Sequence, residues 1–178
     1  GNTQKAHSMM KRLLALSVQN VDRGYCGWGY PFPWQSKAFY VARNEPNTIA
    51  TAYAVRELSN WPSHENADVG AAVVSAARMM AGQFVRKAQA GGLYIAYVQG
   101  SDAIVHNASL WGAYILAQGW RVSGEEQFLQ LASEALAYSA KAQRSDGSWA
   151  YGEAGHHQFT DGFHTGYVLE ALHRIGQA

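Results

Sequence analysis

Apolar residues recur along most of the chain at the three- and four-residue spacing of amphipathic helices. Stop signals, such as Pro62 and the pair Gly91–Gly92, separate these stretches. The pattern predicts six helices, near residues 3–20, 47–61, 64–89, 107–120, 124–143 and 161–175. A long connection rich in aromatic residues separates the first two predicted helices, and residues 93–98 have the alternation of a short extended segment.

The predicted helices alternate in character along the chain. The first, third and fifth carry most of the charge, whereas the others begin at Asn47, Asn107 and Asp161, residues suited to helix starts. Ser123 and Glu126 have the spacing of a capping box for the fifth helix. We therefore expect an all-α single domain, residues 1–178, made of three tandem αα-hairpins. Their bounds are about 3–61, 64–120 and 124–176.

Composition narrows the classes of partner. The chain is 48% hydrophobic and 15% charged with a net charge of +1, so we expect a globular protein that binds neither nucleic acid nor a membrane surface. No apolar run reaches the roughly 18 residues of a membrane span. Cys26 stands alone, so neither an intrachain disulfide nor a cysteine metal cluster is expected. A cytoplasmic location is the default expectation, and a first residue Gly1 is consistent with a removed leader.

Three segments resemble known toroidal proteins. Gln143-x-x-x-Gly147-x-Trp149 resembles the glutamine–tryptophan repeat of terpene cyclases, whose α/α toroid class includes prenyltransferase subunits and six-hairpin glycan-processing enzymes. Gly29-Tyr30-Pro31-Phe32-x-Trp34-Gln35 and the run 163–169 resemble toroid-like proteins encoded with bacterial exopolysaccharide genes. The resemblance implies a partial α/α toroid and a role in polysaccharide biosynthesis. A complete toroid has more hairpins than three, which implies a homodimer or a missing half-ring.

The densest ionisable cluster lies at the start of the last predicted helix. His164 follows Asp161 by one helical turn, with Tyr151 and His157 upstream. In the catalytic interpretation His164 is a general acid or base, Asp161 orients it and Tyr151 assists. In the alternative, Asp161 caps the helix and His164 is hydrogen-bonded in the core. No metal site and no cofactor are predicted, because the cluster lacks a metal-ligand spacing motif.

Aromatic and polar residues of the loops are candidates for ligand binding. Trp149, Tyr151 and Glu153 alternate, so they share a face in an extended segment, although Trp149 alternatively packs between hairpins. The full set of predicted binding residues is Trp34, Gln35, Arg43, His106, Trp149, Glu153 and His157. If the starts of the second, fourth and sixth helices share one mouth, their backbone N–H groups favour anionic groups there, such as a uronate or phosphate.

These residues support three functional hypotheses. The first is a glycan-processing protein of polysaccharide metabolism, acting on a sugar that contains uronic acid as a lyase, epimerase or hydrolase. The second is a non-catalytic module that binds a glycan, another small molecule or a protein within a polysaccharide assembly system. The third, an isoprenoid cyclase or transferase, is least favoured, because the Asp-rich motifs that bind prenyl diphosphates in the resembled cyclases are missing.

Overall fold

A computed structural model describes residues 2–20, 24–36, 39–61 and 67–178. This part of the chain is mostly helical, as predicted. It contains α1 Asn2–Ala15, α2 Thr48–Ser59, α3 Ala67–Met79, α4 His106–Ser123, α5 Glu126–Lys141 and α6 Gly162–Ile175. A π-helical turn, η1 Met80–Phe84, continues α3, and a 3-10 turn, η2 Gly155–His157, precedes α6. Within the described ranges, no helix has the length and apolar character needed to cross a membrane.

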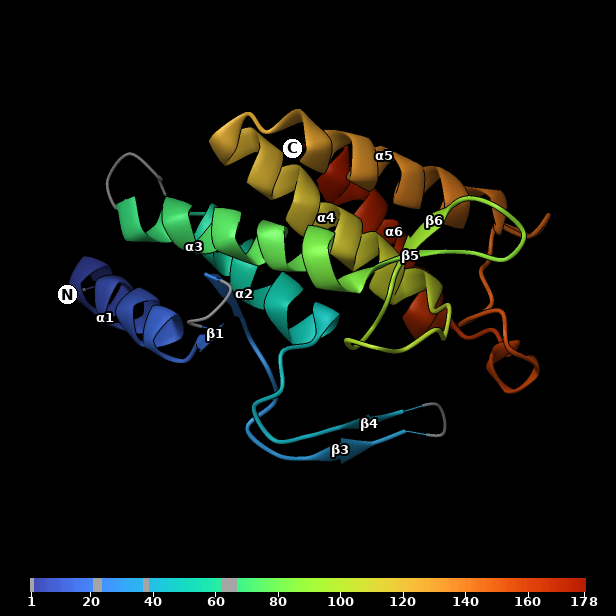
Figure 1. Cartoon of the computed structure of the whole chain (residues 1–178), viewed down its shortest axis with the longest axis horizontal. Coiled ribbons are helices and arrows are strands. Elements are labelled where there is room, and N and C mark those ends of the chain that lie inside the picture. Colours follow the sequence, from blue (N-terminus) through green and yellow to red (C-terminus); the bar gives the residue numbers. More distant parts are fainter. Residues whose placement is uncertain (1, 21–23, 37–38, 62–66) are drawn as a thin grey trace.

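Three short antiparallel strand pairs are present, of which only an extended segment at residues 93–98 was predicted. They are β1 Val18–Asn20 with β2 Tyr25–Gly27, β3 Trp34–Gln35 with β4 Tyr40–Val41, and β5 Val85–Lys87 with β6 Leu93–Ile95. The third helix is therefore shorter than the predicted 64–89. Gly91 and Gly92, with φ of +87° and +93°, form the turn between β5 and β6 rather than a helix end. In Figure 1 the β3–β4 pair extends away from the helices.

The central element is α4, which contacts α2, α3, α5 and α6. Figure 1 shows it running through the middle of the helical body. Every residue from His106 to Gly119 is buried, so this helix has no polar face over most of its length. Gly119 lets α3 approach closely, since a Cβ there would collide with the methyl group of Ala77. The elements that form the candidate site are thus arranged around α4.

Three hydroxyl groups, each four residues after the N-cap of α2, α4 or α6, accept hydrogen bonds from backbone N–H groups of earlier segments. The pairs are Thr51 with Trp28 at 3.0 Å, Ser109 with Ile95 at 3.1 Å, and Thr165 with Trp149 at 3.5 Å. In two of these segments the tryptophan also donates a hydrogen bond from its indole N–H group. Trp28 Nε1 donates to Leu13 O and Trp149 Nε1 donates to Ser139 O, both at 2.8 Å.

The Thr51 contact predicts a measurable stability difference. The substitution Thr51→Val keeps the shape of the side chain but leaves the buried N–H and C=O groups of Trp28 without this hydroxyl. We expect a loss of about 1–3 kcal/mol in the free energy of unfolding, measured by urea denaturation. Thr165→Val is the matched control and should cost less, because its bond is longer and only partly buried. Equal losses in the two variants would show that the Thr51 hydrogen bond contributes no more to the free energy of unfolding than the Thr165 bond.

Two of the predicted helix starts are confirmed by their caps. The side chain of Asn47 accepts from Ala50 N–H at 2.9 Å, and that of Asp161 accepts from His164 N–H at 2.7 Å. The Asn107 start is wrong, because α4 begins one residue earlier and its N-cap is Val105. The capping box is also wrong. The N-cap of α5 is Glu125, and Ser123 Oγ bonds back to Gly119 O within α4.

Candidate functional site

A cavity of about 550 Å³ opens where the segments preceding α2, α4 and α6 meet. We call it the aromatic cavity. Its lining consists of Tyr30, Trp34, Ser36, Ile49, Tyr97, Asn107, Tyr151, His156, His157, Phe159, Phe163, His164 and Tyr167. Among the residues that the structure describes, this lining includes no Asp, Glu, Lys or Arg side chain. A volume of this size and a mainly apolar wall with a few polar groups are typical of small-molecule sites.

Three tyrosines of the cavity share one sequence relationship. Tyr30, Tyr97 and Tyr151 each lie two residues after a residue that is held by a helix hydroxyl, namely Trp28, Ile95 and Trp149. Those three held residues are buried in the core, while the tyrosines line the cavity. The hydroxyl groups of Tyr30 and Tyr97 lie 2.9 Å apart. The wall is thus built by equivalent positions of three loops, which the predicted site did not include as a set.

The His164 side chain is fixed by Asp161 at the edge of this cavity. Its Nδ1 lies 2.7 Å from Asp161 Oδ2, while Asp161 Oδ1 accepts from the His164 backbone N–H. That backbone hydrogen bond is the largest cause of the lowered pKa of Asp161. An ionised carboxylate only accepts, so Nδ1 carries the hydrogen and Nε2 is the nitrogen left for a ligand. Asp161 therefore caps α6 and orients the imidazole at once.

Tyr151 is adjacent to His164 and is a proton donor rather than a base. Its ring lies 4.6 Å from that of His164 and stacks on Phe159 at 5.1 Å. Burial raises the pKa of Tyr151 to about 12, so its hydroxyl stays protonated near neutral pH. Burial also raises the pKa of Tyr97, and the neighbouring Tyr30 adds to that effect. These hydroxyl groups can therefore donate hydrogen bonds to a ligand.

His157 and Trp34 complete the predicted residues that the cavity brings together. His157 is 3% exposed and stands edge-on to Tyr151, with 5.1 Å between the ring centroids. Burial, and then the neighbouring His156, lowers the pKa of His157, which favours its neutral form. Trp34 enters from β3 and packs against Tyr97 at 5.7 Å. Four predicted residues thus share one cavity, with Asp161 holding His164.

Other predicted binding residues lie outside the cavity. The Gln35 amide bends back along its hairpin and donates to Ser36 O at 2.6 Å, and Arg43 is exposed beyond the lining. Glu153 accepts from the Tyr138 hydroxyl at 2.6 Å and lines a different surface hollow beside α5. Tyr151 and Glu153 therefore do not share the ligand face that their alternation predicted.

Trp149 and His106 are core residues in the described structure. Trp149 is 2% exposed, so its ring has almost no surface to offer a ligand, and its packing between helices is the interpretation that fits. His106 is also 2% exposed and does not line the cavity. Burial lowers the pKa of His106, although the charge of Glu153 opposes this effect.

Four backbone N–H groups at the helix starts, where an anion site was predicted, are bonded within the protein. Thr48 N–H donates to Tyr97 O at 2.9 Å, and His106 N–H donates to Tyr151 O at 3.1 Å. The N–H groups of Ala50 and His164 are bound by the caps described above. These four amides are committed to protein acceptors and are therefore not free to bind an anion.

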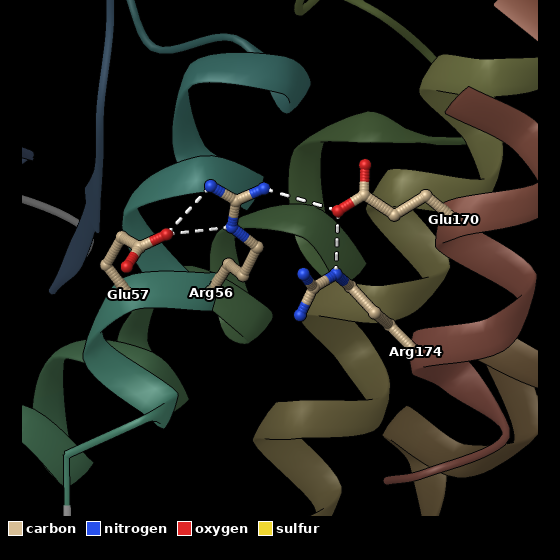
Figure 2. A network of polar contacts seen from close by, with 4 residues as sticks. All are labelled: Arg56, Glu57, Glu170 and Arg174. Atoms are coloured by element: carbon tan, nitrogen blue, oxygen red, sulfur yellow. Dashed lines mark hydrogen bonds and ion pairs between the residues drawn. The ribbon is translucent and has the colours of Figure 1, made fainter. Parts of the chain in front are cut away.

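An ionic cluster links α2 to α6 (Figure 2). Arg56 contacts Glu57 at 2.8 Å and Glu170 at 3.3 Å, and Glu170 accepts from Arg174 at 2.9 Å. Arg56 also lies over the Tyr53 ring at 4.4 Å, a cation–π contact. Tyr53 in turn approaches the cavity residue Tyr167, with 6.1 Å between their rings. The cluster therefore helps to fix the spacing of the two helices that flank the cavity.

The described residues contain no group of three or more His, Cys, Asp or Glu side chains placed to hold a metal ion. No protein-family model matches the sequence, and no curated protein is significantly similar to it. The interpretation of the aromatic cavity therefore rests on its own geometry.

The buried histidines predict a pH dependence of stability. His106 and His157 have lowered pKa values when folded, so the unfolded chain binds more protons just below its ordinary histidine pKa of about 6.5. We expect the free energy of unfolding to be highest above that pH and to fall as the pH drops from 7.5 towards 5. The slope is at most about 1.4 kcal/mol per pH unit for each histidine.

Denaturant unfolding at a series of pH values measures this effect. His106→Gln removes one of the two groups and should reduce the slope, whereas substitution of the exposed His173 should leave it unchanged. Equal slopes in wild type and His106→Gln would refute the assignment of the effect to His106.

Proposed function

We propose that this chain binds a glycan in the aromatic cavity and processes it by proton transfer at His164. The observation that carries the proposal is the enclosure of an Asp161-oriented imidazole by tyrosine, tryptophan and phenylalanine rings. Such rings pack against the C–H faces of sugars, and tyrosine hydroxyl groups pair with sugar hydroxyl groups. Aromatic residues and histidine in this arrangement favour a saccharide ligand.

The chemistry of the lining favours elimination or epimerisation over ordinary hydrolysis. Glycoside hydrolysis usually needs two carboxyl groups that flank the bond, and the lining residues within the described ranges include none. His164 Nε2 can instead remove a proton from carbon, with Asp161 stabilising the imidazolium. In an elimination a C=C bond forms, the C–O bond breaks, and the Tyr151 hydroxyl gives its proton to the leaving oxygen. A uronic-acid sugar suits this step because its carboxyl group acidifies the neighbouring C–H.

Incubation with oligosaccharides that contain uronic acid tests the catalytic part of the proposal. Elimination should produce unsaturated sugars with new ultraviolet absorbance, and epimerisation should exchange the abstracted hydrogen for solvent deuterium, which mass spectrometry detects. If neither product is detected, the second candidate remains, which is a non-catalytic glycan-binding module. That candidate is favoured by the described part of the lining, which holds no Asp, Glu, Lys or Arg side chain.

We also infer that α1–α2, α3–α4 and α5–α6 are three consecutive hairpins of a partial α/α toroid, with α2, α4 and α6 on its inner side. The three equivalent hydroxyl contacts support this arrangement, because a repeated unit places the same bond at the same position. Exposed apolar side chains at Met9 of α1 and Leu169 of α6 are consistent with an open row of hairpins. Closure by a second copy or by a missing half-ring remains a prediction, as does a cytoplasmic location.

A further inference from the structure

Asn107 lies near the start of α4, and the equivalent positions of α2 and α6 hold apolar residues. Ile49, Asn107 and Phe163 each lie two residues after the N-cap of α2, α4 or α6, and all three line the aromatic cavity. In α2 and α6 this position is apolar, with Ile49 buried and Phe163 largely exposed. The helix start therefore does not itself require a polar side chain, and the asparagine of α4 needs another explanation.

The side-chain oxygen of Asn107 has no partner within the described chain. Asn107 is 6% exposed, and its Oδ1 is fully buried with no hydrogen-bond partner. A buried polar group that lacks a partner opposes folding unless something else binds it. His157 has the same property, since it is 3% exposed and its buried Nδ1 has no partner among the described residues. Two unsatisfied polar side chains thus line one cavity.

Both residues line the cavity together with Tyr151. The neighbour of Asn107, His106, donates its N–H to Tyr151 O, and the His157 ring stands edge-on to the Tyr151 ring. Tyr151 is also the residue in ring contact with His164. A ligand placed against Tyr151 for reaction at His164 therefore lies beside Asn107 and His157 as well.

We propose that Asn107 and His157 form a polar subsite that recognises hydroxyl groups of the sugar bound in the aromatic cavity. The inference rests on the proposed glycan binding and specifies which part of the sugar faces the inner wall. An uncommitted amide can offer N–H or C=O, and a neutral imidazole offers one donor and one acceptor. A hydroxyl group both donates and accepts, so it pairs with either side chain. A carboxylate only accepts, and neither Asn107 nor a neutral His157 brings it a positive charge.

The substitution Asn107→Leu tests the subsite with two readouts. Leucine has a similar volume and no polar atom to leave unpaired, so the variant should melt at the same temperature as wild type or higher. Binding is measured with methyl pyranosides of glucose, galactose and mannose, each beside its single-deoxy analogues. Wild type should bind at least one parent sugar about tenfold more tightly than one of its deoxy analogues. Asn107→Leu should bind that pair equally, and His157→Phe should weaken the same preference.

His173→Ala is the control, because His173 is exposed and lies outside the cavity lining, and it should keep the preference. If Asn107→Leu still distinguishes the parent sugar from its deoxy analogue, the subsite is overturned while the proposed glycan binding stands. If Asn107→Leu melts several degrees below wild type, Asn107 is a structural residue and the subsite is likewise overturned. If wild type binds none of these sugars or their uronic acids, the proposed function fails and the subsite fails with it.

Discussion

His164→Ala is expected to reduce turnover of a uronic-acid oligosaccharide by about 10²–10⁴-fold, the usual range for loss of a general acid or base. Stability should change little. The backbone N–H at position 164 still binds Asp161 in the variant, so the cap of α6 survives. Only the side-chain pair is lost, and a pair whose members are 25% and 39% exposed contributes about 0–1 kcal/mol. Initial rates and thermal melting of the same protein sample measure both effects.

His173→Ala is the matched control, because His173 lies on the same helix and is exposed. It should retain both turnover and melting temperature. A large fall in the melting temperature of His164→Ala with unchanged turnover would show that His164 is a structural histidine. In that case the aromatic wall would remain as the argument for ligand binding, without an acid–base group.

Trp149→Ala should lower the free energy of unfolding by about 3–5 kcal/mol, the usual cost of deleting a large buried ring. The Trp149 ring is 2% exposed, and its Nε1 donates to Ser139 O at 2.8 Å. Alanine would leave a void next to α5, and Ser139 O would keep only the hydrogen bond that it accepts from Ala142 N–H. Guanidinium denaturation measures the loss, and a change in the slope with denaturant would reveal an altered unfolded state.

Trp34→Ala is the comparison for Trp149, since Trp34 is half-buried at the edge of the cavity on the β3–β4 pair. It should cost less stability and weaken sugar binding. The opposite result, in which Trp149→Ala unfolds like wild type but loses sugar affinity, would reinstate Trp149 as a ligand-binding residue.

Helix caps were predictable where the hydrogen bond spans only a few residues. Asn47 and Asp161 each bind an N–H three positions ahead, so the short-range signal was sufficient. The start of α4 depends on a distant partner, because His106 N–H is taken by Tyr151 O. A partner so far along the chain leaves no trace in the local pattern, and Asn107 was therefore misread as a cap.

The end of the third helix shows a second limit of sequence patterns. The apolar spacing continues through residues 85–87, where the chain actually pairs with β6. Over so few residues, helical spacing and strand alternation look alike. The pairing of Val85 with Ile95 is decided by contacts across the turn, which the spacing within either segment does not encode.

The sequence predicted the site residues that lie in one short segment. It missed those that reach the cavity from separate loops. Tyr151, His157 and His164 belong to one short segment, and a dense cluster of such residues was visible in the sequence. Tyr30 and Tyr97 reach the cavity only because two separate loops pack together, with their hydroxyl groups 2.9 Å apart. An alignment of the three loops at Trp28, Ile95 and Trp149 places Tyr30 and Tyr97 at the position of Tyr151.

Glu153 was misplaced for a local geometric reason. Its predicted position beside Tyr151 assumed that the segment stays extended. Instead Gly152 N–H donates to His157 O at 3.0 Å, and η2 turns the chain immediately afterwards. This turn brings His157 to the cavity and leaves Glu153 bonded to Tyr138.

Sugar binding by the aromatic cavity is tested most directly by ligand-observed saturation-transfer NMR on wild type and Trp34→Ala. The sugars are the methyl pyranosides named above and the corresponding uronic acids. Wild type should bind at least one of them, and Trp34→Ala should bind it at least about tenfold more weakly, a loss of about 1.4 kcal/mol. A wild-type protein that binds none of these sugars, or a Trp34→Ala protein that binds as tightly as wild type, would contradict the assignment of the cavity as a glycan site.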